Sequence, residues 1–265
     1  MRFYRSENNA LVYCEKKANP DYWDDLWIDD AIQSKMFFKN RYLLRLVKKY
    51  LIKGSRILEG GCGCGSNVYH LEKSGYRAYG IDYAPKTVSI VKKNIPALSL
   101  LLGDVRKLPL KRDSFQGYVS VGVIEHFYNG YKEIAEEMKR VLDNGGYLFL
   151  SFPQMSAFRK LKARMKKYPE LGKKFDPEAD CFYQYALDRK KVQVYFEQKG
   201  FKKLSHKFDD GIKGLKDEVR FLRPVLQKIY DSRSISAKII KRLLNLLLNR
   251  FFGHSVILVL QKTMV

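Results

Sequence analysis

The chain contains 265 residues, of which 46% are hydrophobic, and it carries a formal net charge of +22. This composition excludes an intrinsically disordered chain, because the apolar side chains suffice for a sizeable core in one large domain. No window reaches the roughly 18 uninterrupted apolar residues of a membrane span, and no leader-like apolar run opens the sequence, so we expect a cytoplasmic protein.

The four cysteines, Cys14, Cys62, Cys64 and Cys181, form no C-x-x-C pair, and the four histidines show no metal-ligand spacing. So few cysteines in a chain of this length argue against a disulfide scaffold, and the missing ligand spacing argues against a zinc site. We therefore expect four reduced thiols and no bound metal.

Residues 1–53 are predicted to form an N-terminal helical segment. Residues 21–50 carry apolar side chains at helical spacing, with Leu43, Leu46 and Val47 on one face. Gly54 follows directly and is typical of a helix end.

From Arg56 onward, short apolar strands alternate with helices. The predicted strands are Arg56–Glu59, Ala78–Ile81, Ser99–Leu102, Gly117–Val121, Tyr147–Phe152, Phe201–Phe208 and Ser255–Leu260. Such alternation implies parallel pairing, so residues 54–265 are predicted to form an α/β domain around a doubly wound, mostly parallel seven-stranded sheet. Two inserts, residues 154–185 and 209–253, interrupt this pattern and are predicted to be helical lids.

The first strand of this domain leads into a glycine-rich loop, Glu59-Gly60-Gly61-Cys62-Gly63-Cys64-Gly65. Glycines let the backbone turn tightly and approach a ligand, and the following helix offers free N–H groups. The loop follows a strand and opens a helix, which is the context that a nucleotide-binding loop requires.

Acidic residues follow the next two strands. Asp82 ends the second strand, 23 residues after Glu59, where a doubly wound fold places a carboxylate against ribose hydroxyls, and Asp104 follows the third strand. A nicotinamide site fits poorly, because Ser66 stands where G-x-G-x-x-G requires its last glycine. Extra carboxylates would also repel a pyrophosphate.

Several segments resemble the class I S-adenosylmethionine-dependent methyltransferases, which have a Rossmann-like fold. RILEGGCGCGSN resembles the first motif of that family and GIDYAP the second; LLGDVRKLPLKRDSFQGYVSVGVIEHF and LDNGGYLFLSFP resemble the later ones. The resemblance covers about residues 50–155 and is greatest to the small-molecule group that includes ubiquinone/menaquinone methyltransferases. It implies S-adenosyl-L-methionine as cofactor and S-adenosyl-L-homocysteine as product.

The cofactor-binding residues that the resemblance implies are Glu59, Gly61, Gly63, Gly65, Asp82, Tyr83, Asp104, Val105, Val121 and Glu125. Glu59 and the glycines would hold the methionine end of the cofactor. Asp82 would bind the ribose, and Asp104 with Val105 would meet the adenine. Residues 121–125 would line the space beneath the methyl group. Cys64 departs from the family, where Thr or Ser is usual.

His126 follows the fourth strand and is the candidate catalytic base, which is needed only if the acceptor must lose a proton. Alternatively, Glu125 and His126 merely cap the following loop. Six aromatic side chains could line a substrate pocket or belong to the core: Tyr4, Tyr22, Trp23, Trp27, Tyr183 and Tyr185.

Positive charge concentrates in residues 151–265, which carry 26 Lys+Arg against 11 Asp+Glu. Apolar side chains at helical spacing lie among the basic ones at residues 158–168 and 240–251. These segments either cover the core, dock on an anionic membrane or capture a lipid-like substrate. Ser120-Val121-Gly122-Val123 replaces the N/D-P-P-Y/F motif of base-amine methyltransferases, which disfavours nucleic acid.

The sequence thus favours methyl transfer to an O or C atom of a small or lipid-linked acceptor. An RNA methyltransferase that uses the basic surface, and a non-catalytic protein that binds S-adenosylmethionine, remain as alternatives.

Overall fold

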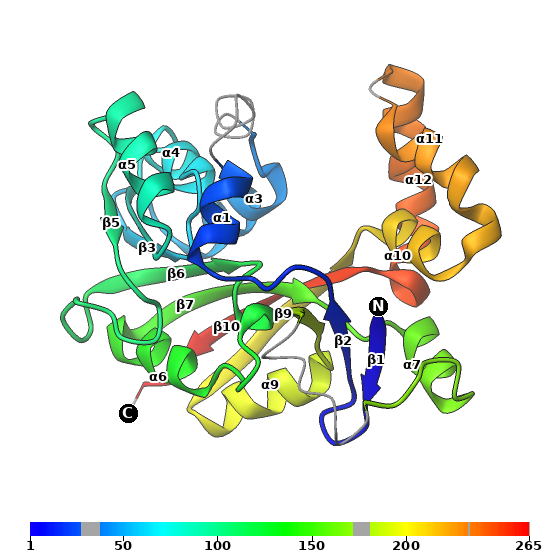
Figure 1. Cartoon of the computed structure of the whole chain (residues 1–265). Coiled ribbons are helices and arrows are strands. Elements are labelled where there is room, and N and C mark those ends of the chain that lie inside the picture. Colours follow the sequence, from blue (N-terminus) through cyan, green and yellow to red (C-terminus); the bar gives the residue numbers. More distant parts are fainter. Residues whose placement is uncertain (28–37, 172–180, 233, 265) are drawn as a thin grey trace.

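The computed structural model describes residues 1–27, 38–171, 181–232 and 234–264. Its centre is a seven-stranded sheet (Figure 1). In sheet order the strands are β5 (Leu100–Leu102), β4 (Arg77–Asp82), β3 (Arg56–Gly60), β6 (Phe115–Val121), β7 (Leu142–Pro153), β10 (Ser255–Lys262) and β9 (Phe201–Asp209). β5, β4, β3, β6 and β7 pair in parallel, and β10 runs antiparallel to both β7 and β9. The predicted α/β fold is confirmed.

Helices cover both faces of this sheet. They are α3 (Arg41–Tyr50), α4 (Ser66–Glu72) and α5 (Pro85–Asn94) on one face, and α6 (Lys132–Val141) and α9 (Arg189–Gln198) on the other. Neighbouring strand residues point to opposite faces. Ile57 accordingly packs with α3, α4 and α5, whereas Leu58 packs with α6 and α9. Because β5, β4, β3 and β6 pair in parallel, their carboxyl ends lie at one common edge of the sheet.

The N-terminal segment is not helical throughout, which corrects the prediction for residues 1–53. β1 (Arg2–Arg5) and β2 (Ala10–Cys14) form an antiparallel pair, and β8 (Phe182–Ala186) adds to β2 as a third strand. Ala10–Cys14 is a short apolar run that lies almost wholly buried in this small sheet, so burial on both faces favours a strand. Helices follow only at α1 (Pro20–Trp27) and α3.

The two inserts also differ in their structure. Residues 154–185 contain a short helix, α7 (Ala157–Arg164), and then β8, so the predicted basic helix ends before Tyr168. Residues 209–253 are helical as predicted: they form α10 (Gly211–Glu218), the 3-10 turn η2 (Arg220–Leu222), α11 (Arg223–Asp231) and α12 (Ile235–Phe252). In Figure 1 α11 and the first turns of α12 stand away from the seven-stranded sheet, whereas the end of α12 lies beside it and contacts β9.

Glu218 at the end of α10 joins both inserts to β1. Its Oε1 accepts hydrogen bonds from the fully buried Arg159 at 3.0 Å and from Arg2 at 2.5 Å, while Lys162 lies 2.8 Å from Oε2. Burial opposes the charge of this carboxylate, but the cations prevail and lower the pKa of Glu218 to about 2. Breaking such a buried network by removing one partner is costly, so it fixes α7 and α10 to the body of the protein.

The structure contains a disulfide between Cys14 and Cys181, which corrects the prediction of four reduced thiols. The pairing of β2 with β8 places Cys14 opposite Phe182, directly beside Cys181, although 167 residues separate the two cysteines in the sequence. Cys62 and Cys64 are buried and take no part in this disulfide. Within the described residues, no helix is long and apolar enough to cross a bilayer.

Candidate active site

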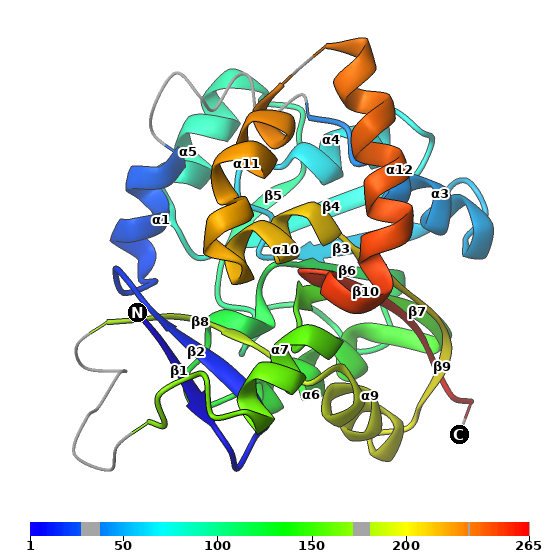
Figure 2. The ribbon, with the colours of Figure 1, turned by 90° about the vertical axis from the view of Figure 1, so that its right-hand side faces the viewer.

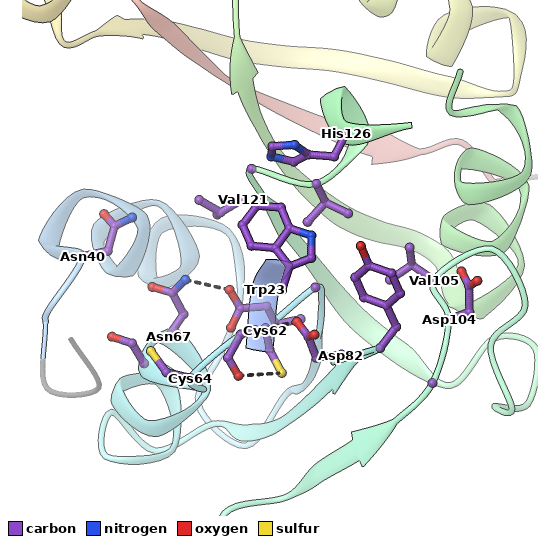
Figure 3. Close-up of a pocket in the computed structure, with 18 of the residues that line it drawn as sticks. Trp23, Asn40, Cys62, Cys64, Asn67, Asp82, Asp104, Val105, Val121 and His126 are labelled. Carbon is purple, nitrogen blue, oxygen red and sulfur yellow. Dashed lines mark hydrogen bonds between the residues drawn. The ribbon is translucent and has the colours of Figure 1, made fainter. Parts of the chain in front are cut away.

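A cavity of about 360 Å³ opens at the carboxyl ends of β3, β4, β5 and β6 (Figure 3). This size falls within the usual range for small-molecule sites. The expected residues in its wall are Glu59, Gly61, Gly63, Asp82, Tyr83, Asp104, Val105, Val121 and His126. The structure thus brings together most of the residues that the sequence singled out.

The glycine-rich loop forms one wall of this cavity because of its backbone conformation. Gly61 and Gly65 adopt positive φ angles of 70° and 73°, and Gly65 caps the N-terminus of α4. A Cβ at Gly61 would lie 2.5 Å from a methyl carbon of Val123, which also lines the cavity. Only glycine fits there, because the loop runs close against Val123, which shares the cavity wall.

Glu59 contributes a buried carboxyl to the cavity wall. Its Oε1 accepts a hydrogen bond from Asn67 at 2.6 Å, and its Oε2 has no hydrogen-bond partner among the described residues. Burial is the main reason that the pKa of Glu59 rises to about 8. A buried acceptor without a partner is costly, and a bound cation or donor would relieve that cost.

Asp82 at the end of β4 holds the loop in place. Its carboxylate accepts hydrogen bonds from the backbone amides of Gly63 at 2.7 Å and Ala84 at 3.0 Å. Burial raises the pKa of Asp82, and these amides act in the opposite direction. Because Asp82 also lines the cavity, one carboxylate both fixes the glycine loop and faces the ligand space.

Asp104 marks the third strand end, where it forms a bidentate ion pair with Arg106, the shortest contact being 2.6 Å. Burial alone would raise its pKa, but hydrogen bonds from Arg106 lower the pKa of Asp104 below its usual value. Asp104 therefore remains ionised in the cavity wall next to Val105.

Gly65 and Glu125 are absent from the cavity wall, although they were expected to contact the cofactor. Gly65 instead supports the loop as the α4 cap. Glu125 is turned into the protein within η1 (Ile124–His126), where burial raises its pKa to about 8 and its Oε2 has no partner among the described residues. The 3-10 turn determines this placement, and a linear motif does not reveal it.

His126 lines the cavity with a defined tautomer. Its Nδ1 lies 2.7 Å from the carbonyl oxygen of Tyr183, which can only accept, so Nδ1 carries the proton and Nε2 keeps its lone pair. Burial lowers the pKa of His126 to about 4, against a smaller opposite effect of that hydrogen bond. Trp23 packs edge-on at 4.8 Å between ring centroids, and the imidazole is neutral at physiological pH.

Other wall residues were not predicted. They are Phe38, Asn40, Cys62, Cys64, Ser66, Asn67, Gly103 and Phe127, whereas Gly122 and Val123 belong to the expected stretch 121–125. Asn67 is the second residue of α4, directly after the glycine loop. This position in the sequence could have indicated that its polar side chain lines the cavity beside Glu59. Trp23, one of the six candidate aromatics, lines the cavity, and Tyr183 lies behind His126. Tyr22 contacts Tyr183.

Tyr4 hydrogen-bonds Asn9 and Tyr185 hydrogen-bonds the Tyr128 carbonyl, both away from this cavity. The side chain of Trp27 lies outside the described part of the chain.

Residues 58–150 match a family model described as a methyltransferase domain, a range that contains the glycine loop and all three strand-end acids. The chain is 32% identical over 105 residues to a probable S-adenosylmethionine-dependent methyltransferase of Mycolicibacterium smegmatis, a match that covers 40% of each protein. Residues 58–150 thus form a methyltransferase domain, and this part of the chain is similar to S-adenosylmethionine-dependent methyltransferases. S-Adenosyl-L-methionine is the cofactor of this family.

Two further relatives of the chain differ in what their names say they act on. It is 31% identical over 101 residues to a phthiotriol/phenolphthiotriol dimycocerosates methyltransferase of Mycobacterium leprae, over 37% of each chain. It is 27% identical over 161 residues to an 18S rRNA (guanine-N(7))-methyltransferase of Mus musculus, over 60% of this chain and 54% of that one. These matches span less than two thirds of each relative.

Solved structures share the fold of the chain at low sequence identity. One is a methyltransferase of Haloferax volcanii in complex with the Trm112 activator, with a TM-score of 0.59 and 16% identity over 93% of this chain and 98% of that one. At this identity the likeness shows the fold alone.

Proposed function

We propose that the chain transfers the methyl group of S-adenosylmethionine to an O or C atom of a small or lipid-linked acceptor. The observation that supports this most strongly is the buried Glu59 carboxyl, which lines the cavity with one oxygen unpartnered among the described residues. A cationic ligand would satisfy that oxygen and keep the carboxylate ionised. The cofactor carries an ammonium group and a sulfonium group, so its chemistry fits this wall.

The cavity residues fit the cofactor in the order that the family's motifs imply. Glu59 and the glycine loop would hold the methionine end, Asp82 with Tyr83 the ribose, and Asp104 with Val105 the adenine. Gly65 and Glu125 would act indirectly, by capping α4 and by supporting η1. When bound, the cofactor supplies an already activated methyl group.

The protein's own contribution is positioning and proton handling. Val121, Gly122 and Val123 would exclude water from the reacting end of the cavity, and the neutral His126 would accept a proton at Nε2. Because Nδ1 is bonded to the Tyr183 carbonyl, the imidazole is held in one orientation and needs no tautomer change before it acts.

A lipid-linked acceptor is favoured over RNA. The relative from M. leprae is named for a lipid-like acceptor, and the cavity wall is mostly apolar around Val121, Val123 and Phe127. The proposed location is cytoplasmic, at a membrane surface. RNA is the second candidate, because one relative is named for rRNA and the chain has a net charge of +22.

The proposal is tested by incubating the protein with S-adenosylmethionine labelled in its methyl group, together with total lipid extract or total RNA. The proposal expects label in the lipid fraction and loss of that label in His126→Asn. Label in RNA instead would establish the second candidate. Binding of S-adenosylhomocysteine without label in either fraction would favour a non-catalytic protein.

A further inference from the structure

The helix α12 presents an apolar face to solvent. Seven of its large hydrophobic side chains are 41–78% exposed: Ile235, Ile239, Ile240, Leu243, Leu246, Leu247 and Phe251. At 100° per residue these positions span about 160° of the helix circumference. Ser236 and Arg250 also lie within this arc, but soluble proteins rarely expose so much apolar surface on one helix. We call these seven side chains the apolar stripe.

The opposite side of α12 is fully used in holding the helix to the protein. Asn245 and Asn249 accept hydrogen bonds from the backbone amides of Ile212 at 2.9 Å and Gly211 at 2.8 Å, at the start of α10. Ala237 is buried, and Phe252 packs against Phe158 of α7 at 4.9 Å between ring centroids. Because α12 is anchored through its other side, the apolar stripe is not needed to hold the helix to the described part of the protein.

Beside the stripe lies a strongly cationic groove between α3 and α12. Figure 2 shows the ribbons of these two helices. Its described lining contains six cations and one carboxylate, namely Lys39, Arg41, Arg45, Lys48, Lys207, Arg242 and Asp209. Leu246 of the apolar stripe also lines this groove. The sequence of α12 itself contains four cations and no acidic residue. Positive charge and apolar surface thus meet along one helix.

We propose that α12 and the adjoining cationic groove dock the protein on an anionic lipid membrane. An interfacial helix buries its apolar side chains at the boundary between headgroups and acyl chains, and flanking cations bind the anionic headgroups. RNA would use the cations but leave the apolar stripe in water. A lipid surface satisfies both features at once.

The groove also borders the cofactor cavity. Phe38 and Asn40 line the cavity, whereas the alternate residues Lys39 and Arg41 line the groove. A protein docked through the groove would hold the cavity beside the lipid headgroups. This consequence for the acceptor rests on the proposed function, but the docking itself does not.

The test is flotation of the full-length protein with vesicles of phosphatidylcholine alone or with 30% phosphatidylglycerol. We expect binding to the anionic vesicles only, and release as the salt concentration rises. Leu246→Gln with Leu247→Gln should weaken the binding about 100-fold, because two apolar side chains no longer enter the lipid. Arg45→Gln with Lys48→Gln should weaken it about 30-fold.

Matched variants on another part of the surface serve as controls. Val194→Gln removes an exposed apolar side chain from α9, and Lys190→Gln with Lys202→Gln removes two charges away from the groove. Both should bind vesicles as the unmodified protein does. Binding of S-adenosylhomocysteine should stay unchanged in every variant, which separates a failure of docking from a failure of the proposed function.

Three results would overturn the proposal. The first is equal or absent binding of the unmodified protein to the two kinds of vesicle. The second is a dimer that Leu247→Gln dissociates while vesicles remain unbound. The third is RNA binding that needs the groove cations and is insensitive to the leucines.

Discussion

The buried carboxyl of Glu59 makes cofactor affinity depend on pH. Burial is the largest cause of its raised pKa of about 8; the hydrogen bond from Asn67 opposes burial, and the nearby Asp82 adds to it. A cationic ligand binds the carboxylate form, so binding below pH 8 must displace a proton from Glu59. Affinity for S-adenosylhomocysteine, which carries an ammonium group, should therefore rise with pH.

The expected size of this change in affinity with pH follows from proton linkage. If Glu59 has a pKa of about 8 in the free protein and is fully ionised in the complex, affinity rises about 20-fold between pH 6 and pH 7.5. The range stops at pH 7.5, where the amino group of the ligand still carries its proton, so that only Glu59 titrates.

Isothermal titration calorimetry in buffers of different ionisation enthalpy measures both the affinity and the proton released. Glu59→Gln should bind more weakly and lose the pH dependence. Glu197→Gln, an exposed side chain on α9, is the matched control and should keep the full slope. A flat affinity profile in the unmodified protein, with no proton released, would refute this reasoning.

Two further predictions concern the loop and the histidine. Gly61→Ala should lower stability by about 2 kcal/mol, because it combines a positive φ with a Cβ 2.5 Å from Val123, and the melting temperature should fall by about 4–8 °C. Gly130→Ala shares the positive φ but meets no atom within 4 Å, so a loss as large there would contradict the steric cause. His126→Asn, which can still donate to the Tyr183 carbonyl, should keep S-adenosylhomocysteine affinity and lower methyl transfer about 100-fold. Since the pKa of His126 is about 4, that factor should be the same at pH 5.5 and pH 7.5, and a factor that collapses at pH 5.5 would contradict it.

Local sequence patterns were sufficient for the central part of the site. The glycine loop, Asp82 and Asp104 each follow a strand whose apolar run is visible in the sequence, and parallel strands bring such positions to one edge. This central part of the cavity wall could therefore be predicted before its geometry was known. Glu125 was misplaced because η1 turns its side chain inward, and only the turn geometry shows this.

Contributions from distant segments could not be predicted in the same way. Trp23, Phe38 and Asn40 reach the cavity from the N-terminal segment, and no spacing relates them to the glycine loop. The small sheet of β1, β2 and β8 could not be predicted for the same reason, since the register of β2 with β8 joins residues about 170 positions apart. That register also brings Cys14 to Cys181. Such long-range pairing depends on tertiary packing, which short apolar runs do not specify.

The most direct test of the account is a crystal structure with S-adenosylhomocysteine. We predict the ligand in the cavity at the carboxyl ends of β3 and β4, with its ammonium within hydrogen-bond distance of the Glu59 carboxylate and its ribose at Asp82. A ligand bound elsewhere, or a cavity that stays empty at saturating concentration, would contradict it.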